Sequence, residues 1–312
     1  MTYYRNRPAF GSACLALLIA PALHAAGVYS NATGVTPGAI DNPIQRTSGS
    51  IVMWENSVVS YLPAPGVNAS FKNPTTGLAS LGDLYNPMTT TGSATVGLIG
   101  STAPGSITLS FAQAIYDGPG ADFAVFEQGF INGSNTSQLF AEFAYVEVSS
   151  DGINFARFDS ISTNTAHSAG SGAFAYYDVT NVYNLAGKHA SNWGTPFDLN
   201  QLATHNLVTD GFLDLAAILY VRLVDVVGSG SILDGEGNEI PGIAKDSLGN
   251  PIRDNWVTTG SGGFDYVGLP TGAIGALNVV PEPSSAVIGA CFAGILLGAR
   301  RRGGRSNSTL QD

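Results

Sequence analysis

Cysteine is nearly absent from this sequence. The 312 residues include two cysteines, Cys14 and Cys291, and both lie in apolar segments near the chain ends. The region between these segments therefore has no disulfide framework and no thiolate for catalysis or metal binding. A region of about 250 residues can still bury a hydrophobic core of adequate size.

Charged residues are also scarce, at 12% of the chain, and those within residues 26–280 are mostly acidic. Seven Lys and Arg stand there against twenty-one Asp and Glu, a formal charge of −14. Nucleic acid and anionic membrane surfaces would repel such a domain, so neither is an expected partner of it. Cation binding and plain solubility are the two explanations for the excess acid.

Familiar catalytic motifs are missing. The sequence has no Gly-x-Ser-x-Gly, no His-Glu-x-x-His and no phosphate-binding loop. His167, His189 and His205 are the histidines after the first 26 residues, and each stands alone in sequence. Triad partners need not be close in sequence, so a hydrolase is not excluded, but no motif supports one. We leave the question of an enzyme open and favour a non-catalytic protein.

Short segments of alternating polarity, separated by turn residues, predict an all-β domain. In the most regular stretch, residues 121–159, two apolar segments precede the turn Ser149–Gly152. Asp-Gly favours a tight turn, so Val146–Val148 and Asn154–Phe158 are expected to pair as a hairpin. Further strands are predicted within Ile51–Leu62 (interrupted at Glu55–Asn56), Ala94–Ile99, Ser106–Ile115, Ala173–Val182, Ala217–Val227, Phe264–Leu269 and Ala273–Val280, with an irregular Leu185–Leu202 and a short helical turn at Phe197–Leu202. One domain, residues 27–280, with the architecture of a β-sandwich or jelly roll, fits this pattern.

The first 26 residues have the layout of a signal peptide. Arg5 and Arg7 precede the apolar segment Ala13–Ala22, and small residues follow it. The apolar segment is short for a stable membrane span, so we predict a signal-peptide helix that is removed after Ala25 or Ala26.

The last residues resemble the PEP-CTERM sorting signal of Gram-negative bacteria. The motif Pro281, Glu282, Pro283 precedes the short apolar segment Ser284–Ala299, which predicts a short transmembrane helix. A basic cluster follows the segment and places that end in the cytoplasm: Arg300, Arg301, Arg302 and Arg305.

The resemblance implies export across the inner membrane, recognition by an exosortase and delivery to the cell surface or extracellular matrix. It also implies an association with exopolysaccharide and biofilm. The similarity covers residues 281–305, and residues 306–312 form a polar tail.

The central domain resembles the galactose-binding-like jelly roll of discoidin-type modules. The similarity lies in residues 146–155, Val-Glu-Val-Ser-Ser-Asp-Gly-Ile-Asn-Phe, and in the later Tyr220-Val221-Arg222-Leu223. It implies a sandwich fold and, less directly, carbohydrate binding. The ligand-contacting loops of that family have no counterpart that can be placed on residues here.

Carboxylates are the first candidates for chemistry. Asp122 with Glu127, and Glu142 with Glu147, flank strand segments at a spacing of five, which places the members of a pair on opposite faces. We therefore interpret them mainly as surface charges, although two carboxylates from different strands, such as Asp122 or Glu127 with Asp225, would suffice for a glycosidase.

Two further carboxylates, Asp225 and Asp265, share a strand face with apolar residues or lie beside them. A buried carboxylate needs a partner, so a metal or backbone amides of the glycine-rich residues 228–263 are expected near them. The sequence Asp234-x-Glu236-x-Asn238 begins like an EF-hand, but Glu239 and Lys245 occupy its sixth and twelfth positions. Calcium in irregular loops stays one interpretation and a solvated acidic loop the other. The candidate metal ligands are Asp122, Glu127, Asp225 and Asp265.

Aromatic rings in loops are the candidates for sugar binding. Trp193 and Trp256 lie among polar residues that predict loops, and Lys188 and His189 precede Trp193. These four are the candidate ligand-binding residues, although core packing explains the tryptophans equally well. Three hypotheses follow: an exopolysaccharide-binding matrix protein, a glycan-active hydrolase, and a purely structural surface protein.

Overall fold

The computed structural model describes residues 29–64, 67, 69–74, 78–80, 104–170, 174–228, 239, 242–255, 264–267 and 272–281. The predicted signal peptide, the strand at Ala94–Ile99 and Trp256 lie outside these residues. So does the sorting signal beyond Pro281, namely Glu282, Pro283, the apolar segment Ser284–Ala299 and the basic cluster of Arg300, Arg301, Arg302 and Arg305. In the described part, no helix has the length and hydropathy to cross a membrane.

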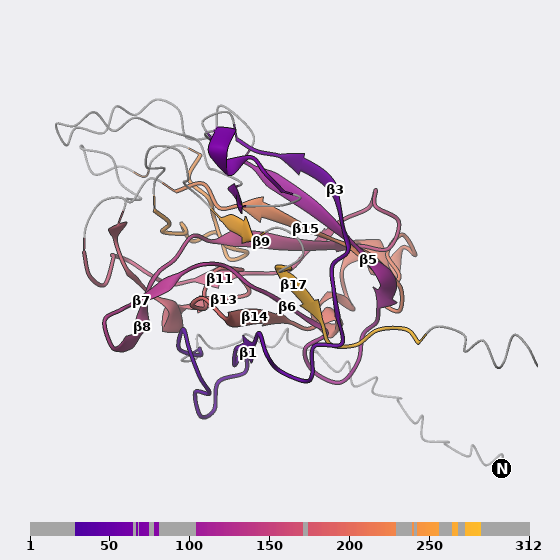
Figure 1. The fold of residues 1–312 in the computed structure, drawn as a ribbon, viewed down its shortest axis with the longest axis horizontal. Coiled ribbons are helices and arrows are strands. Elements are labelled where there is room, and N and C mark those ends of the chain that lie inside the picture. Colours follow the sequence, from indigo (N-terminus) through magenta and orange to yellow (C-terminus); the bar gives the residue numbers. More distant parts are fainter. Residues whose placement is uncertain are drawn as a thin grey trace, which may run out of the picture.

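The described chain is all-β, and every strand pairing in it is antiparallel (Figure 1). The first sheet has the order β1 (Ile44–Gln45), β14 (Trp193–Phe197), β6 (Phe123–Val125), β17 (Ile274–Ala276), β2 (Met53–Trp54). The second sheet has the order β10 (Ala156–Arg157), β9 (Ala144–Ser149), β15 (Ile218–Asp225), β5 (Ser106–Ile115), β3 (Ser57–Leu62).

Smaller elements complete the domain. A three-stranded sheet has the order β12 (Tyr177–Asp178), β8 (Asn135–Phe140), β7 (Phe130–Asn132), and two strand pairs are β11 (Ile161–Ser162) with β13 (Val182–Tyr183) and β16 (Asp265–Val267) with β4 (Leu78–Ser80). The described helices are the short η1 (Ala69–Phe71), η3 (Val179–Asn181), η4 (Leu199–Leu202) and α1 (Asn206–Thr209).

One hydrophobic core lies between the two five-stranded sheets. Phe123 and Phe197 of the first sheet and Val146 and Leu223 of the second belong to the same cluster of buried residues. The Phe123 and Phe197 rings stack with centroids 5.4 Å apart. Strands of both sheets thus bury their apolar faces against each other, as the alternation of polar and apolar residues predicted.

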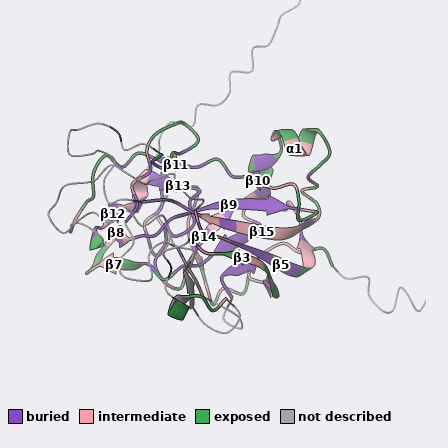
Figure 2. Ribbon diagram, turned by 90° about the horizontal axis from the view of Figure 1, so that it is seen from above, coloured by how far each residue is buried: buried purple, intermediate pink, exposed green. Residues whose placement is uncertain are grey.

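A second core covers the other face of β9. Tyr145 packs there with Leu139 of β8, Tyr177 of β12 and Ile252. Both faces of β9 are therefore buried, and Figure 2 shows the strand buried along its length, whereas the β7–β8 hairpin is more exposed. This second layer was not evident from the sequence, because alternation in one strand does not reveal what covers its polar face.

Several predicted elements are confirmed. β5 has the predicted bounds, β2 and β3 are separated at Glu55–Asn56, and β9 pairs with β10 as predicted. The β9–β10 turn is held by Asp151, whose Oδ1 accepts the backbone N–H groups of Ile153 and Asn154, both at 2.8 Å. Gly152 adopts a φ of 76° in this turn, which explains the Asp-Gly sequence.

Two predictions are wrong. Ala173–Val182 is not one strand, because Asp178 ends β12 and caps η3 by accepting the Thr180 N–H. The segment Leu185–Leu202 is not wholly irregular, since it contains β14, which pairs with β6 near the centre of the first sheet. Gly194 and Pro196 within β14 obscured this strand in the sequence.

The last described residues lead directly into the predicted sorting signal. Val279 forms a bridge with Ile115, and the Val280 N–H donates to the Ala114 carbonyl at 2.8 Å. Pro281 is exposed directly after it.

Candidate functional site

Two of the predicted ligand-binding residues lie in the interior. Lys188 is fully buried and His189 is 1% exposed, so neither side chain faces a surface where a ligand could contact it. Lys188 forms an ion pair with buried Asp41, and its Nζ lies 3.3 Å from Ser30 Oγ. These contacts join the connection before β14 to the N-terminal segment, residues 29–43.

The same cluster determines the protonation state and the tautomer of His189. Burial and the neighbouring Lys188 lower the pKa of the imidazole well below its usual value, so the ring is neutral. Its Nε2 lies 2.9 Å from Ser30 Oγ, and its Nδ1 lies 3.0 Å from Thr195 Oγ1. Ser30 Oγ donates to the Asp41 carbonyl, so Nε2 carries the proton and Nδ1 accepts from Thr195. This serine–histidine contact is buried, and a substrate does not reach it.

One of the two tryptophans predicted in loops lies in a strand. Trp193 begins β14 and is half-buried, so its prediction as a loop residue is wrong. Trp256 lies outside the described residues. Trp54 packs at 5.3 Å from the Phe126 ring, with the Arg46 guanidinium 4.9 Å above it, which is a packing role on the outer face of the first sheet.

The interpretation of the four strand-flanking carboxylates as surface charges is wrong. Asp122, Glu127, Glu142 and Glu147 are all buried. Glu147 points to the covered face of β9 and forms ion pairs with Arg157 and Arg222, which are both partly exposed. The rule of alternating faces failed here because the strands are covered on both sides.

Asp122 ties three segments together at one end of β6. Its Oδ1 accepts the Gly118 N–H at 2.7 Å and the Asn278 side-chain amide at 2.8 Å. Its Oδ2 accepts the Leu199 N–H at 2.7 Å. Burial raises the pKa of Asp122, with a contribution from the Asp198 carboxylate, while the three hydrogen bonds oppose this shift.

Two of the other three predicted metal ligands, Glu127 and Asp225, accept backbone N–H groups from the neighbouring residues Phe264 and Asp265, beyond the opposite end of β6. The Phe264 N–H donates to Asp225 Oδ1 at 2.7 Å, so a backbone amide is a partner of this carboxylate, although it lies one residue beyond the glycine-rich residues 228–263 from which an amide or a metal was expected. The next N–H, of Asp265, donates to Glu127. The four predicted ligands therefore do not form one site, since Asp122 lies apart from the other three.

Glu127 is the most perturbed of these carboxyl groups. Burial and the Asp265 carboxylate raise its pKa to about 8. Its Oε2 accepts the Gly129 N–H at 2.5 Å. A protonated carboxyl group could act as a general acid, but this one is enclosed and a glycan cannot contact it. The burial therefore disfavours Glu127 and Asp225 as a glycosidase pair.

Two other carboxylates lie close to Asp122. Carboxylate oxygens of Asp117, Asp122 and Asp198 lie within 4.8 Å of one another. Sequence reasoning missed Asp117 and Asp198, because they come from the β5–β6 and β14–η4 connections and only folding brings them together. Oxygen ligands suit calcium, but calcium takes six to eight of them, and Asp122 already accepts three hydrogen bonds. The hydrogen bonds that Asp122 accepts account for its position in this group without a bound ion.

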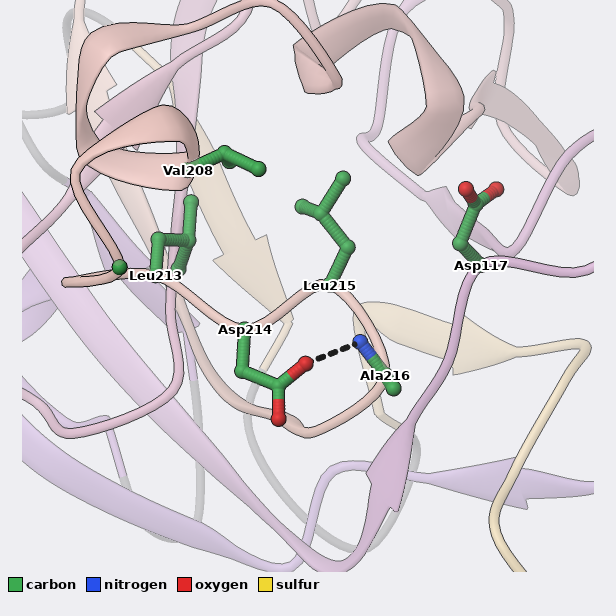
Figure 3. Close-up of a pocket in the computed structure, with 7 residues that line it drawn as sticks. Asp117, Val208, Leu213, Asp214, Leu215 and Ala216 are labelled. Carbon is green, nitrogen blue, oxygen red and sulfur yellow. Dashed lines mark hydrogen bonds between the residues drawn. The ribbon is translucent and has the colours of Figure 1, made fainter.

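An open hollow of about 680 Å³ lies beside this acidic group (Figure 3). Its lining residues are Asp117, Val208, Gly211, Leu213, Asp214, Leu215 and Ala216. In Figure 3, Leu215 lies between Val208 of α1 and Asp117. Asp214 is exposed and accepts the Ala216 N–H at 2.9 Å. The lining combines apolar side chains with two carboxylates, and carboxylates can accept hydrogen bonds from a ligand that carries hydroxyl groups.

Comparison of the chain with known protein families and with curated proteins finds no match.

Proposed function

We propose that this chain is an exported surface protein of a Gram-negative bacterium, sorted by a PEP-CTERM tail, whose jelly-roll ectodomain binds extracellular polysaccharide without catalysis. One observation carries the proposal. Pro281-Glu282-Pro283, the apolar segment and the arginines that begin at Arg300 follow immediately after Val280, the last described residue bonded to the domain. Pro281, the first residue of this motif, is exposed.

The sorting function predicts a loss of processing when the motif is changed. In a Gram-negative host with an exosortase, replacing Pro281 and Pro283 with alanine will leave the tail attached and the protein in the inner membrane. Cell fractionation and the mass of the C-terminal peptide measure this. Pro37→Ala, at another exposed proline, is the control and will be processed normally. Normal processing of the double variant would refute the sorting assignment.

The charge of the domain narrows the class of polysaccharide. A formal charge of −14 over residues 26–280 repels acidic polymers at moderate ionic strength. A neutral polysaccharide avoids this repulsion, and an acidic one needs calcium between polymer and protein. We assign the polymer to the hollow beside α1, where Asp117 and Asp214 supply hydrogen-bond acceptors next to Leu215.

Retention of the full chain on immobilised neutral and acidic polysaccharides, with calcium and with chelator, tests the binding function. We expect retention on the neutral polymer in both buffers and roughly tenfold weaker retention for Asp117→Asn, the loss of one charged hydrogen-bond acceptor. Asp159→Asn removes the same charge from an exposed site and is the control. Equal loss for both variants would place binding elsewhere, and Trp193→Ala then tests the aromatic candidate. Retention on no polymer would favour the purely structural role, and release of reducing ends would favour the hydrolase.

A further inference from the structure

The buried cluster of Ser30, Asp41, Lys188 and His189 places an amine against a carboxyl group in the interior. Asp41 is 4% exposed and Lys188 is fully buried, and Lys188 Nζ directly contacts Asp41 Oδ2. The Tyr29 ring covers Nζ, with its centroid 5.5 Å away. Water is therefore largely excluded from both groups.

Charge is poorly tolerated at this place. Two ions removed from water lose their hydration, and their attraction compensates for this loss only partly. Burial lowers the pKa of Lys188 to about 8, even though Asp41 favours the charged amine. The contact between Nζ and Oδ2 is a path for transfer of one proton, which would leave a free amine beside a carboxylic acid. An amine and a carboxylic acid are the reactants of amide formation.

The surrounding groups hold the carboxyl group for attack. The Ser30 N–H donates to Asp41 Oδ1 at 2.8 Å, on the oxygen that does not contact the amine. Ser30 Oγ donates to the backbone carbonyl oxygen of Asp41 at 2.8 Å and lies 3.3 Å from Lys188 Nζ. One residue therefore fixes Asp41 and also supplies a backbone donor where negative charge would develop on Oδ1.

We propose that Lys188 Nζ and Asp41 Cγ form an intramolecular amide bond. The ammonium first gives one proton to Oδ2, and the lone pair of the neutral amine then attacks Cγ. The Ser30 N–H stabilises the oxyanion on Oδ1 in the tetrahedral intermediate. The Cγ–Oδ2 bond breaks, and Oδ2 leaves as water with two protons that came from Nζ. The ammonium and carboxylate become one amide and one water, with no oxidant, cofactor or nucleotide. Fixed contact between the groups replaces chemical activation of the acid.

The amide bond would do in this domain what a disulfide does elsewhere. Residues 26–280 contain no cysteine, and the two linked positions are 147 residues apart in sequence. A link across so long a loop restricts the unfolded chain strongly. It would also hold the N-terminal segment, residues 29–43, against the body of the domain.

Mass spectrometry of the full chain, exported and purified, tests the proposal. The folded protein will weigh about 18 Da less than its processed sequence, because one water is lost. Trypsin will not cut after the acylated Lys188, and the peptide that ends at Arg46 will be joined to the peptide spanning residues 158–222. Separate, unmodified peptides from a chain with native β-sheet circular dichroism would refute the bond.

Variants separate the reaction from simple packing. Lys188→Met keeps a long side chain without an amine and will show neither the mass loss nor the joined peptide. Asp41→Asn keeps the attack but loses ammonia, so its mass will fall by about 17 Da instead. Glu147→Gln changes another buried ion-paired residue and will keep the joined peptide. Persistence of the joined peptide in Lys188→Met would assign the link to another residue and overturn the proposal.

Discussion

Replacing Gly187 with alanine will destabilise the domain by about 4 kcal/mol or more. Gly187 adopts a φ of 85°, and a Cβ built on it would lie 1.9 Å from the carbonyl oxygen of Glu142. That oxygen belongs to the backbone just before β9, where Ala186 and Ala144 exchange hydrogen bonds of 2.9 and 3.1 Å. The backbone must therefore move to relieve the clash. This movement would break both hydrogen bonds and displace the adjacent Lys188 from its buried position.

Thermal unfolding of Gly187→Ala beside Gly211→Ala measures this effect. Gly211 has a similar φ of 78°, but no heavy atom lies within 4 Å of the place its methyl group would take. Its replacement therefore costs only the backbone strain, about 1 kcal/mol. The difference between the two variants isolates the close approach. Equal and small shifts would show that β9 and the connection before β14 do not pack as described.

Replacing Glu127 with glutamine will make the domain more stable at pH 8 while changing little at pH 5. The pKa of Glu127 is raised from 4.5 to about 8 by burial and by Asp265. The folded chain therefore keeps a proton that the unfolded chain releases between pH 4.5 and pH 8. Its contribution to stability is fully present below the unfolded pKa and is lost as the pH rises through the folded pKa, about 8.

Glutamine cannot ionise and can still accept the Gly129 N–H. The variant therefore avoids the loss of stability that ionisation of Glu127 causes as the pH rises from 4.5 to about 8. We expect its advantage in the free energy of unfolding to reach about 2 to 4 kcal/mol at pH 8. Urea unfolding at pH 5, 6.5 and 8 measures the slope. Glu147→Gln is the matched control, because it removes a carboxylate that is paired with Arg157 and Arg222, and it will destabilise the domain at pH 8. An advantage for Glu127→Gln that does not change with pH would exclude the raised pKa.

The candidate sites were predicted less well than the strands. Asp225 was correctly expected to share the buried face of its strand, because its position in an alternating strand places it beside Val221 and Leu223, whereas the sequence did not decide between a metal and a backbone amide as its partner. Lys188 and His189 were expected to meet a ligand, yet they are buried. A polar sequence neighbourhood indicates a loop, but it does not reveal whether another segment covers that loop. The covering residues, Asp41 and Ser30, come from the distant N-terminal segment, 147 and 158 residues before Lys188.

The sequence by itself determined the all-β class, the β9–β10 hairpin and the long strands β5 and β15, since alternation and turn chemistry are local properties of neighbouring residues. Only the tertiary structure decided which polar residues are buried. Glu147 is enclosed because a second core covers the outer face of β9, and Glu127 is buried where the Asp265 N–H donates to it. Asp117 meets Asp198 because two connections converge at one end of β6. Burial of a charge depends on every segment packed around it, and that arrangement is settled by long-range packing and not by the residues next to it in the chain.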